Sequence, residues 1–586
     1  MINMLIYIRF VRKNMPFFAK NKITILSLFA LSLAGLLYKC CTKQERCEYK
    51  EWPVTVCSNV VLSSSKTEEA VIDSEVKNCP LGAKQISSDA ITRAKMWAGV
   101  KSIIKDTVVQ IIVHITPFNF LQPYKISDVS EFSGSAFFIS SDGYLITNAH
   151  VVNQAKVVWL RVPSLGQQIV DASVICVSPE RDLALVKVSK EGCQAIISKI
   201  GHIPYLELGS SDNMFRADKV MALGYPLGQT SLKSTTGVIS GREHINNQHL
   251  IQMSAPINTG SSGGPVINME GEVVGVSIGG IFASGAQNVG YIIPASELKI
   301  ILPDMYQEDE SKTKLLRRPF LGALYCNGSK ELCEYLGNPY PGGLYVVESY
   351  KGGPLEMAGI KSGDMIYQVN GVDVDMYGDL IVSWSEDKIP LIDYISRLRL
   401  GQDVNVVLYR NGERKELDMK FEQTELLPVR MIYPSYEEVD YENFGGIVTM
   451  SLALNHIPIF ASLSPRLTKY TQTKNQTEAA VVVTYIIPNS QAHRTLSIGP
   501  SSIIEKINEQ EVETLEDLRR IIRESLGCKK HLILQTTDGI KIALSLDKMV
   551  EETQHLSLLY RYPITPFAKE CIDIMDRKKG VIQNVV

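Results

Sequence analysis

The chain has 586 residues, of which 45% are hydrophobic and 21% are charged. These proportions are typical of globular proteins, and they exclude wholesale disorder, a collagen and a polytopic membrane protein. The 60 basic and 63 acidic residues leave a net charge of −3, so the composition predicts no nucleic-acid partner. At about 150 residues per domain, the length suggests three or four folded units.

The amino terminus carries an apolar run, Ile23–Tyr38, and basic residues such as Arg12 and Lys22 precede it. A basic flank marks the side of such a run that stays in the cytoplasm. As a helix the run is about 24 Å long, which is short for a hydrocarbon core of ~30 Å. We therefore expect residues 1–39 to be a signal peptide or a membrane anchor, and the rest of the chain to be exported. Residues 40–95 have little periodicity and are expected to be a linker.

The 11 cysteines form no CxxC pair, and no His stands beside a Cys pair. The sequence therefore predicts no metal site and no cofactor. Five of the cysteines precede residue 80, where they are either disulfides of an exported segment or free thiols. They are Cys40, Cys41, Cys47, Cys57 and Cys79.

From about Lys101 the pattern changes to short β-rich runs separated by Gly, Asp and Asn. Many short strands with turns between them are typical of a barrel or a sandwich. The clearest strand candidates are residues 108–113, 136–139, 157–160, 174–177 and 183–188.

Three motifs in this region carry the chemistry. His150 follows the strand phrase Tyr144–Thr147, Asp182 precedes the apolar run that starts at Leu183, and Ser262 lies in Asn-Thr-Gly-Ser-Ser-Gly-Gly-Pro. The chain order His, Asp, Ser is that of the chymotrypsin type. Each motif alone is more often a turn, a cap or a structural histidine, but the three together favour a catalytic triad.

The residue types fit acyl transfer. A serine hydroxyl is a weak nucleophile, and His150 would accept its proton as Ser262 attacks. Asp182 would hold the imidazole tautomer and stabilise the imidazolium. The backbone N–H groups of Gly260 and Ser262, together with that of Ser261, would form the oxyanion hole.

This region resembles the protease domain of the HtrA/Deg (protease Do-like) family. The triad motifs, the phrases at 220–228 and 234–241 and the closing strand Gly290–Pro294 carry the resemblance. It implies a mainly β chain with a chymotrypsin-like double β-barrel at residues 96–305 and the active site between the barrels. It also implies a protein exported to the periplasm, or anchored in the membrane facing it. The chain departs from the family's usual Asn-Pro-Gly-Asn-Ser at Thr259 and Ser261.

The run that contains Ser277, Ile278 and Gly279 is expected to wall the primary substrate pocket. It carries no acidic residue that could hold Lys or Arg. We therefore expect a preference for small or medium aliphatic residues before the cleaved bond.

Two further modules follow the protease region. Residues 315–425 resemble a PDZ domain, whose carboxylate-binding loop would be Phe320, Leu321, Gly322 and Ala323. Residues 435–550 repeat part of this pattern, since Ile503-Ile504 and Ile507-Asn508 echo Met365-Ile366 and Val369-Asn370. We interpret them as a degenerate second PDZ-like α+β domain, with an amphipathic helix at 515–522 and a role in assembly. Asn443–Ile447 stands where its carboxylate loop would be. Residues 551–586 are expected to be a C-terminal tail.

The sequence thus favours a serine endopeptidase that degrades misfolded or damaged exported proteins without ATP. Its expected partners are unfolded polypeptides and peptide C-termini. The resemblance implies a homo-oligomer, a trimer or a multiple of it. The alternative is a chaperone or peptide-binding scaffold with little or no proteolysis, and the intact triad argues against it.

Overall fold

The computed structural model describes most of the chain from residue 104 onward. The described ranges are 104–245, 247–279, 288–318, 322–350, 352–422 and 426–583. The expected leader (1–39) and linker (40–95) lie outside them. By its contacts the chain divides into two units, Met1–Gln85 and Ile86–Val586, and every described residue belongs to the second. None of the helices in these ranges combines the length and the apolar character needed to cross a bilayer.

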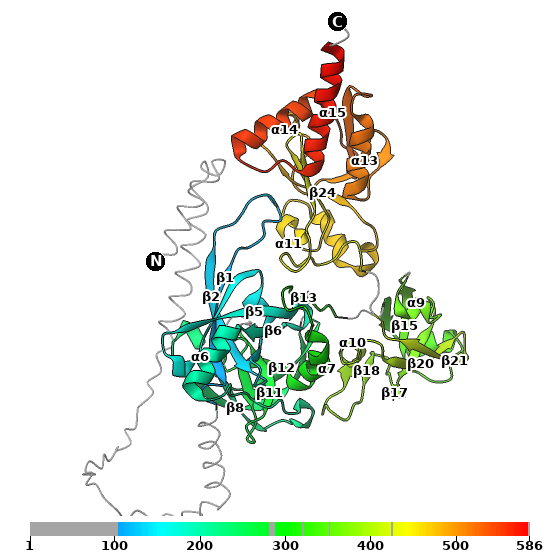
Figure 1. Cartoon of the computed structure of the whole chain (residues 1–586). Coiled ribbons are helices and arrows are strands. Elements are labelled where there is room, and N and C mark those ends of the chain that lie inside the picture. The colour runs from blue at the N-terminus through cyan, green and yellow to red at the C-terminus, as the bar shows by residue number, and fades with distance from the viewer. Residues whose placement is uncertain are drawn as a thin grey trace, which may run out of the picture. The chain divides into compact units, whose positions relative to one another are not determined.

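The first barrel follows residue 107 (Figure 1, blue to cyan). Its strands run in the order β5-β4-β1-β2-β3-β6, and pairing of β5 with β6 closes it. On β1, Val109, Ile111 and Val113 alternate into one buried cluster, as the two-residue period of a strand requires. The strands are β1 (Val108–Ile115), β2 (Ser130–Phe138), β3 (Tyr144–Thr147), β4 (Ala155–Arg161), β5 (Ile169–Ser178) and β6 (Leu183–Val188).

The second barrel closes in the order β10-β11-β12-β9-β8-β7 and is followed by α7 (Ala295–Met305). One hydrophobic cluster contains Phe137 and Leu185 of the first barrel together with Leu223 and Val276 of the second, so the two barrels share a core. The expected double barrel is confirmed. The strands are β7 (Lys219–Gly224), β8 (Lys233–Ile245), β9 (Gln248–Met253), β10 (Pro265–Ile267), β11 (Val273–Ile278) and β12 (Gly290–Pro294).

The first PDZ domain is a sheet in the order β14-β15-β16-β20-β21, with β17 paired to β16. A separate hairpin of β18 (Asp379–Leu380) and β19 (Ile389–Pro390) precedes α10 (Leu391–Ser396). The other elements are β14 (Ala323–Asn327), α8 (Lys330–Tyr335), β15 (Leu344–Ser349), α9 (Pro354–Met357), β16 (Met365–Val369), β17 (Val372–Asp373), β20 (Asp403–Arg410) and β21 (Glu413–Lys420).

The second PDZ-like domain repeats this order as β23-β24-β25-β27-β28, with β26 paired to β25. The internal repeat seen in the sequence therefore places β16 and β25 at equivalent positions. One strand is additional, because β22 (Tyr441–Phe444) pairs with the outer edge of β23. The strands are β23 (Ile447–Ser451), β24 (Val481–Ile486), β25 (Ile503–Ile507), β26 (Gln510–Glu511), β27 (His531–Thr536) and β28 (Lys541–Ser545).

Helix α13 (Leu515–Ser525) is the amphipathic helix expected at 515–522. Leu515, Leu518, Ile521 and Ile522 are all buried, and Thr514 and Asp517 form a capping box at its start. Asn443–Ile447, expected to be a second carboxylate loop, instead spans the end of β22 and the turn into β23. The edge of β23 is therefore already paired with the chain's own strand.

The second domain also continues beyond residue 550. Helix α14 (Leu546–Tyr560) follows β28 directly, and α15 (Pro566–Gln583) begins after a connection at 561–565. Phe567, Ala568 and Cys571 lie in the same core as the sheet. The expectation of a tail at 551–586 was therefore wrong for most of that segment. Its apolar residues are buried against the sheet, which repays the cost of ordering them.

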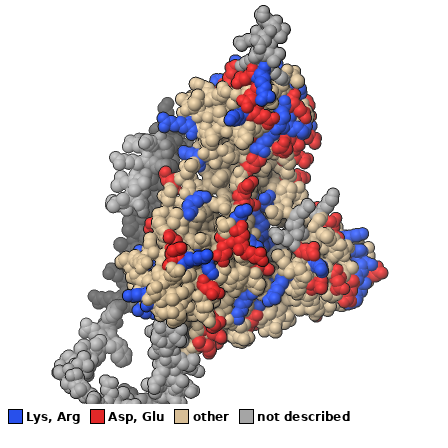
Figure 2. Space-filling model, in the orientation of Figure 1, with Lys and Arg blue, Asp and Glu red and all other residues tan. Residues whose placement is uncertain are grey.

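A helical insertion between β23 and β24 was also not foreseen. It comprises α11 (His456–Phe460) and the short 3₁₀ segments Pro465–Thr471 and Thr473–Asn475. Phe460 and Leu467 are buried in a small cluster of their own. On the face drawn in Figure 2, acidic and basic side chains are interspersed, in keeping with the small net charge.

One buried ion pair joins β22 to α13. Glu442 is 1% exposed, and its Oε2 atom lies 3.1 Å from Nε of Arg519. Burial raises the pKa of Glu442, while hydrogen bonds to Asp440 and Glu442 raise the pKa of Arg519. Arg519 also bonds both carboxylate oxygens of Asp440, at 2.7 and 2.8 Å. This network fixes the added strand against the helix.

Replacing Arg519 with Leu should leave the Glu442 carboxylate buried without its cation. We expect hydrogen exchange in β22–β28 of the full chain to report an opening free energy lower by about 3–5 kcal/mol. Arg520→Leu is the matched control, because Arg520 makes only exposed ion pairs. Adding Glu442→Leu to Arg519→Leu should restore most of the protection. Unchanged exchange in Arg519→Leu would show that the pair does not hold the strand.

Candidate active site

His150 and Asp182 are brought together by the pairing of β3 with β6. Thr147 ends β3 opposite Ala184, so the turns that carry the two residues leave the same end of these strands. Nδ1 of His150 lies 2.8 Å from Oδ2 and 3.0 Å from Oδ1 of Asp182. The backbone N–H of His150 also donates to Oδ1, at 2.9 Å. The carboxylate therefore fixes both the imidazole ring and its helix, α5 (Ala149–Val152).

The environments of the two side chains differ. The Asp182 side chain is 15% exposed and the His150 side chain 46%. Asp182 has a left-handed φ of 54° at the end of the 3₁₀ turn Pro179–Arg181, and its carbonyl accepts a hydrogen bond from Nδ2 of Asn148 at 3.0 Å. A sheltered carboxylate beside a half-exposed imidazole keeps the outer ring nitrogen, Nε2, available for proton transfer. No described residue makes a hydrogen bond to that nitrogen.

Ser262 lies in the turn before β10 and is 6% exposed. The turn contains two glycines in the left-handed region, Gly260 at φ 93° and Gly263 at φ 82°. A Cβ atom on Gly263 would lie 2.2 Å from both the Ser135 carbonyl oxygen and Oγ1 of Thr147, so only glycine fits. The same built Cβ would lie 3.1 Å from the backbone N of Asn148. The residue after Ser262 therefore contacts the chain segment that leads into His150.

Ser135 ties the serine turn to the first barrel. It is fully buried on β2, and its N–H donates to the Ser262 carbonyl at 2.8 Å. Its hydroxyl donates to the Gly260 carbonyl at 2.8 Å and accepts from the N–H of Tyr225 at 2.9 Å. Two hydrogen bonds from Ser135 thus hold the serine turn, and a third joins the same hydroxyl to Tyr225.

The backbone amides around Ser262 are not equivalent. The N–H of Ser261 donates to the Asn258 carbonyl at 2.9 Å, and that of Gly263 donates to the Ser277 carbonyl at 3.0 Å. Within the described residues, the N–H groups of Gly260 and Ser262 donate to no protein group. Of the three amides expected in an oxyanion hole, these two are free to bind a substrate oxygen in this conformation, whereas that of Ser261 is occupied.

The strand expected to wall the substrate pocket contacts Ser262 directly. Oγ of Ser262 accepts a hydrogen bond from the N–H of Gly279 at 3.0 Å. Ser277 is 1% exposed, and its hydroxyl donates to the carbonyl of Ser261 at 2.6 Å. Ile278 is buried. Ser277 and Gly279 therefore both make hydrogen bonds to the serine turn.

The carboxylate loop expected in the first PDZ domain is only partly described. Phe320 and Leu321 lie outside the described residues. Gly322 has φ 76°, its carbonyl accepts from the N–H of Tyr350 at 2.7 Å, and Ala323 begins β14. Within the described residues, β14 pairs only with β15, so its outer edge has no strand beside it.

Two contributors to the site escaped the sequence analysis. Ser135 directly precedes the strand candidate at 136–139 and Asn148 lies two residues before His150, but no role was predicted for either side chain. One sequence feature could have pointed to Ser135. It is a small polar residue directly before an apolar run that forms a buried strand. The sequence predicted no metal site. The described residues contain no group of three His, Cys, Asp or Glu side chains that could hold a metal ion.

Comparison with protein families matches residues 134–276 to the trypsin-like peptidase domain and residues 319–421 to the PDZ domain. The chain is 29% identical over 415 residues to a probable periplasmic serine endoprotease, DegP-like, of Chlamydia pneumoniae. That match covers 69% of this chain and 74% of the relative. A protein of the same description from Hahella chejuensis is 29% identical over 399 residues, covering 67% and 75%.

Among solved structures, the HtrA-type protease AlgW with a decapeptide is 24% identical with a TM-score of 0.43, covering 56% of this chain and 98% of that one. The peptidase domain, the PDZ domain and the DegP-like relatives define a serine endopeptidase. The chain is similar to the HtrA/Deg serine proteases and carries a trypsin-like peptidase domain followed by a PDZ domain.

Ser135→Ala tests whether the hydrogen bonds of this hydroxyl position the serine turn. Its loss leaves the buried Gly260 carbonyl and Tyr225 N–H without their partner, so we expect kcat to fall by about 10–100-fold with little change in KM. The measurement is steady-state cleavage of a fluorogenic peptide. Ser140→Ala is the matched control, since the Ser140 hydroxyl has no hydrogen-bond partner among the described residues. A rise in KM at constant kcat would contradict a positioning role.

Proposed function

We propose that this protein cleaves misfolded or damaged exported polypeptides, without ATP, through a triad of His150, Asp182 and Ser262. The observation that carries the proposal is the pairing of Asp182 with Nδ1 of His150, at 2.8 Å. The close approach of Gly263 to Thr147 and Asn148 supports it, because the turn that holds Ser262 adjoins the segment that holds the imidazole.

The proposed reaction has two halves. Ser262 attacks the substrate carbonyl while Nε2 of His150 takes the hydroxyl proton. Asp182 stabilises the imidazolium, and the N–H groups of Gly260 and Ser262 bind the oxygen that becomes negative. The imidazolium then gives its proton to the leaving amine, and the acyl chain remains on Ser262. A water molecule, deprotonated by the same imidazole, releases the acid and restores the hydroxyl.

The hydrogen bond from Gly279 to Oγ of Ser262 defines a resting arrangement. Attack requires Oγ to exchange this donor for Nε2 of His150. Rotation about the Cα–Cβ bond of Ser262 between staggered positions is the smallest movement that could do so. The expected preference for aliphatic residues before the cleaved bond stays part of the proposal.

The first PDZ domain would gather substrates. The outer edge of β14 is unpaired within the described residues, so an extended peptide could add there as a strand, with its C-terminal carboxylate at the loop around Gly322. In the second domain β22 already holds the equivalent edge, which supports a role in assembly. A homo-oligomer of three subunits or a multiple is the proposed assembly.

The descriptions of the similar proteins support a periplasmic location for this chain. Several are described as periplasmic serine endoproteases. We propose that this chain is likewise exported, with residues 1–39 as a cleaved leader or an anchor.

Ser262→Ala should lower the rate of casein hydrolysis by at least about 1,000-fold, and so should His150→Ala, because each removes a member of one catalytic unit. A fluorophosphonate probe should label Ser262 in the unmodified protein and fail to label the His150→Ala variant. Ser231→Ala, a change at an exposed serine of the same barrel, is the control and should keep full activity. Equal casein hydrolysis by the unmodified protein and Ser262→Ala would defeat the proposal.

A further inference from the structure

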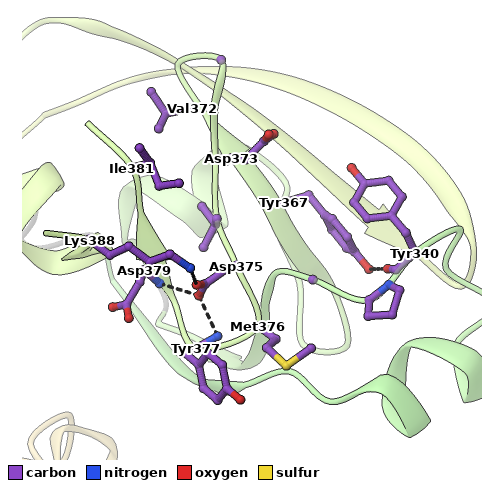
Figure 3. Close-up of a pocket in the computed structure, with 14 residues that line it drawn as sticks. Tyr340, Tyr367, Val372, Asp373, Asp375, Met376, Tyr377, Asp379, Ile381 and Lys388 are labelled. Carbon is purple, nitrogen blue, oxygen red and sulfur yellow. Dashed lines mark hydrogen bonds and ion pairs between the residues drawn. The ribbon is translucent and has the colours of Figure 1, made fainter. Parts of the chain in front are cut away.

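The first PDZ domain contains a hollow that the peptidase chemistry does not use. Its volume is about 650 Å³, within the range of about 300–1,000 Å³ that is usual for ligand sites. None of its lining residues belongs to β14, to α10 or to the loop around Gly322. It is therefore separate from the sheet edge expected to bind peptide C-termini (Figure 3).

One wall of the hollow is aromatic and fixed. The rings of Tyr340 and Tyr367 meet edge to face with centroids 5.0 Å apart, and Tyr409 supports Tyr367 at 4.9 Å. The Tyr367 hydroxyl donates to the Tyr340 carbonyl at 2.8 Å, which holds the loop after α8 in place. Such a wall loses little conformational freedom when a ligand binds.

The opposite wall comes from the segment around β18 and is acidic. Asp375 organises it, because its carboxylate accepts from the N–H groups of Tyr377 and Asp379, each at 2.9 Å, and from Nζ of Lys388 at 2.7 Å. Figure 3 shows Asp375, Asp379 and Lys388 together on this side and Tyr340 and Tyr367 on the other.

Asp379 and Asp373 leave negative charge in the hollow after Lys388 has paired with Asp375. No described residue donates a hydrogen bond or an ion pair to the Asp379 carboxylate, and Asp373 has only the neutral Nε2 of Gln368, at 2.6 Å. Burial, and then the neighbouring Asp375, raise the pKa of Asp379. A bound cation would relieve both costs, since it compensates the lost hydration and the repulsion between the two carboxylates.

Large apolar side chains surround this charge at the surface. Ile381 is 75% exposed and Tyr377 is 67% exposed, and both line the hollow. Exposed apolar groups around unpaired carboxylates fit a side chain with an apolar stem and a cationic head. Tyrosine rings add attraction for such a head by cation–π contact.

We propose that this hollow is a second substrate-docking site, which binds a lysine or arginine side chain within an unfolded polypeptide, flanked by apolar residues. The idea rests on the proposed function only in naming unfolded polypeptides as the ligand. It differs from capture of a C-terminus, because an internal basic residue needs no free carboxylate. Two recognition sites on one domain would let a single chain bind at both and so gain in avidity.

The test uses the full chain carrying Ser262→Ala and a fluorescent peptide with an acetylated N-terminus and an amidated C-terminus. The peptide has one central lysine between two leucines, and a second peptide has norleucine in its place. Fluorescence anisotropy should show the lysine peptide binding at least about tenfold more tightly. Equal affinity of the two peptides, or binding only when the C-terminus is free, would overturn the proposal.

Variants then locate the site. Asp379→Asn combined with Asp373→Asn should weaken binding of the lysine peptide about tenfold and leave the norleucine peptide unchanged. Ile381→Arg, a change at an exposed position, should weaken it similarly by repulsion and needs no buried group to be altered. Asp403→Asn is the matched control, an exposed aspartate of the same domain outside the hollow. Unchanged affinity in both pocket variants would refute the site.

Failure of this proposal is distinguishable from failure of the proposed function. Casein hydrolysis is measured on the same pocket variants with Ser262 intact. Loss of lysine-peptide binding with measurable cleavage retained supports the docking site on an active protease. Unchanged peptide binding removes the docking site, whatever the rate of hydrolysis.

Discussion

The proposed active site depends on the close contact between the serine turn and the first barrel at Gly263. The turn approaches Ser135 and Thr147 so tightly that a single Cβ atom would collide with both. Two hydrogen bonds from Ser135, to the carbonyls of Gly260 and Ser262, hold the same turn. Because His150 and Asp182 come from one barrel and Ser262 from the other, this contact determines whether the three can act together.

The contact also explains why small residues surround the serine. A larger residue at Gly263 would separate the barrels where the proposed triad requires the Ser262 hydroxyl to meet the His150 imidazole. The shared hydrophobic core, which includes Phe137 and Val276, holds the two barrels together. The hydrogen bonds of Ser135 and Ser277 then position the turn within it, since hydrogen bonds are directional and apolar packing is not.

Much of this arrangement could be predicted from the sequence. The strand phrases predicted a barrel or a sandwich, and the family resemblance carried by the His150, Asp182 and Ser262 motifs implied the double barrel. The internal repeat located β25, and the apolar periodicity of α13 was read correctly. Ser135 and Asn148 were missed because their hydrogen bonds join segments that meet only in the folded chain.

In the second PDZ-like domain, too, local sequence patterns did not predict contacts between distant segments. The glycines at 445 and 446 were compatible with a carboxylate loop or with a hairpin turn. Residues distant in sequence stabilise the hairpin. Arg519 pairs with Glu442 of β22, and the Thr565 hydroxyl donates a hydrogen bond to the same carboxylate. The apolar face of α15 could not be assigned to the core without knowing that a sheet lay beneath it. Tertiary contacts thus determine both the turn at 445–446 and the packing of α15, which the local sequence pattern did not.

The most direct test of the central claim is a crystal structure of the protein after reaction with a fluorophosphonate. The account predicts phosphorus bonded to Oγ of Ser262, with a phosphonyl oxygen about 2.7–3.1 Å from the N–H nitrogens of Gly260 and Ser262. Nε2 of His150 should face the same adduct, and Asp182 should remain on Nδ1. Modification of a different residue, or a phosphonyl oxygen remote from both amides, would contradict it.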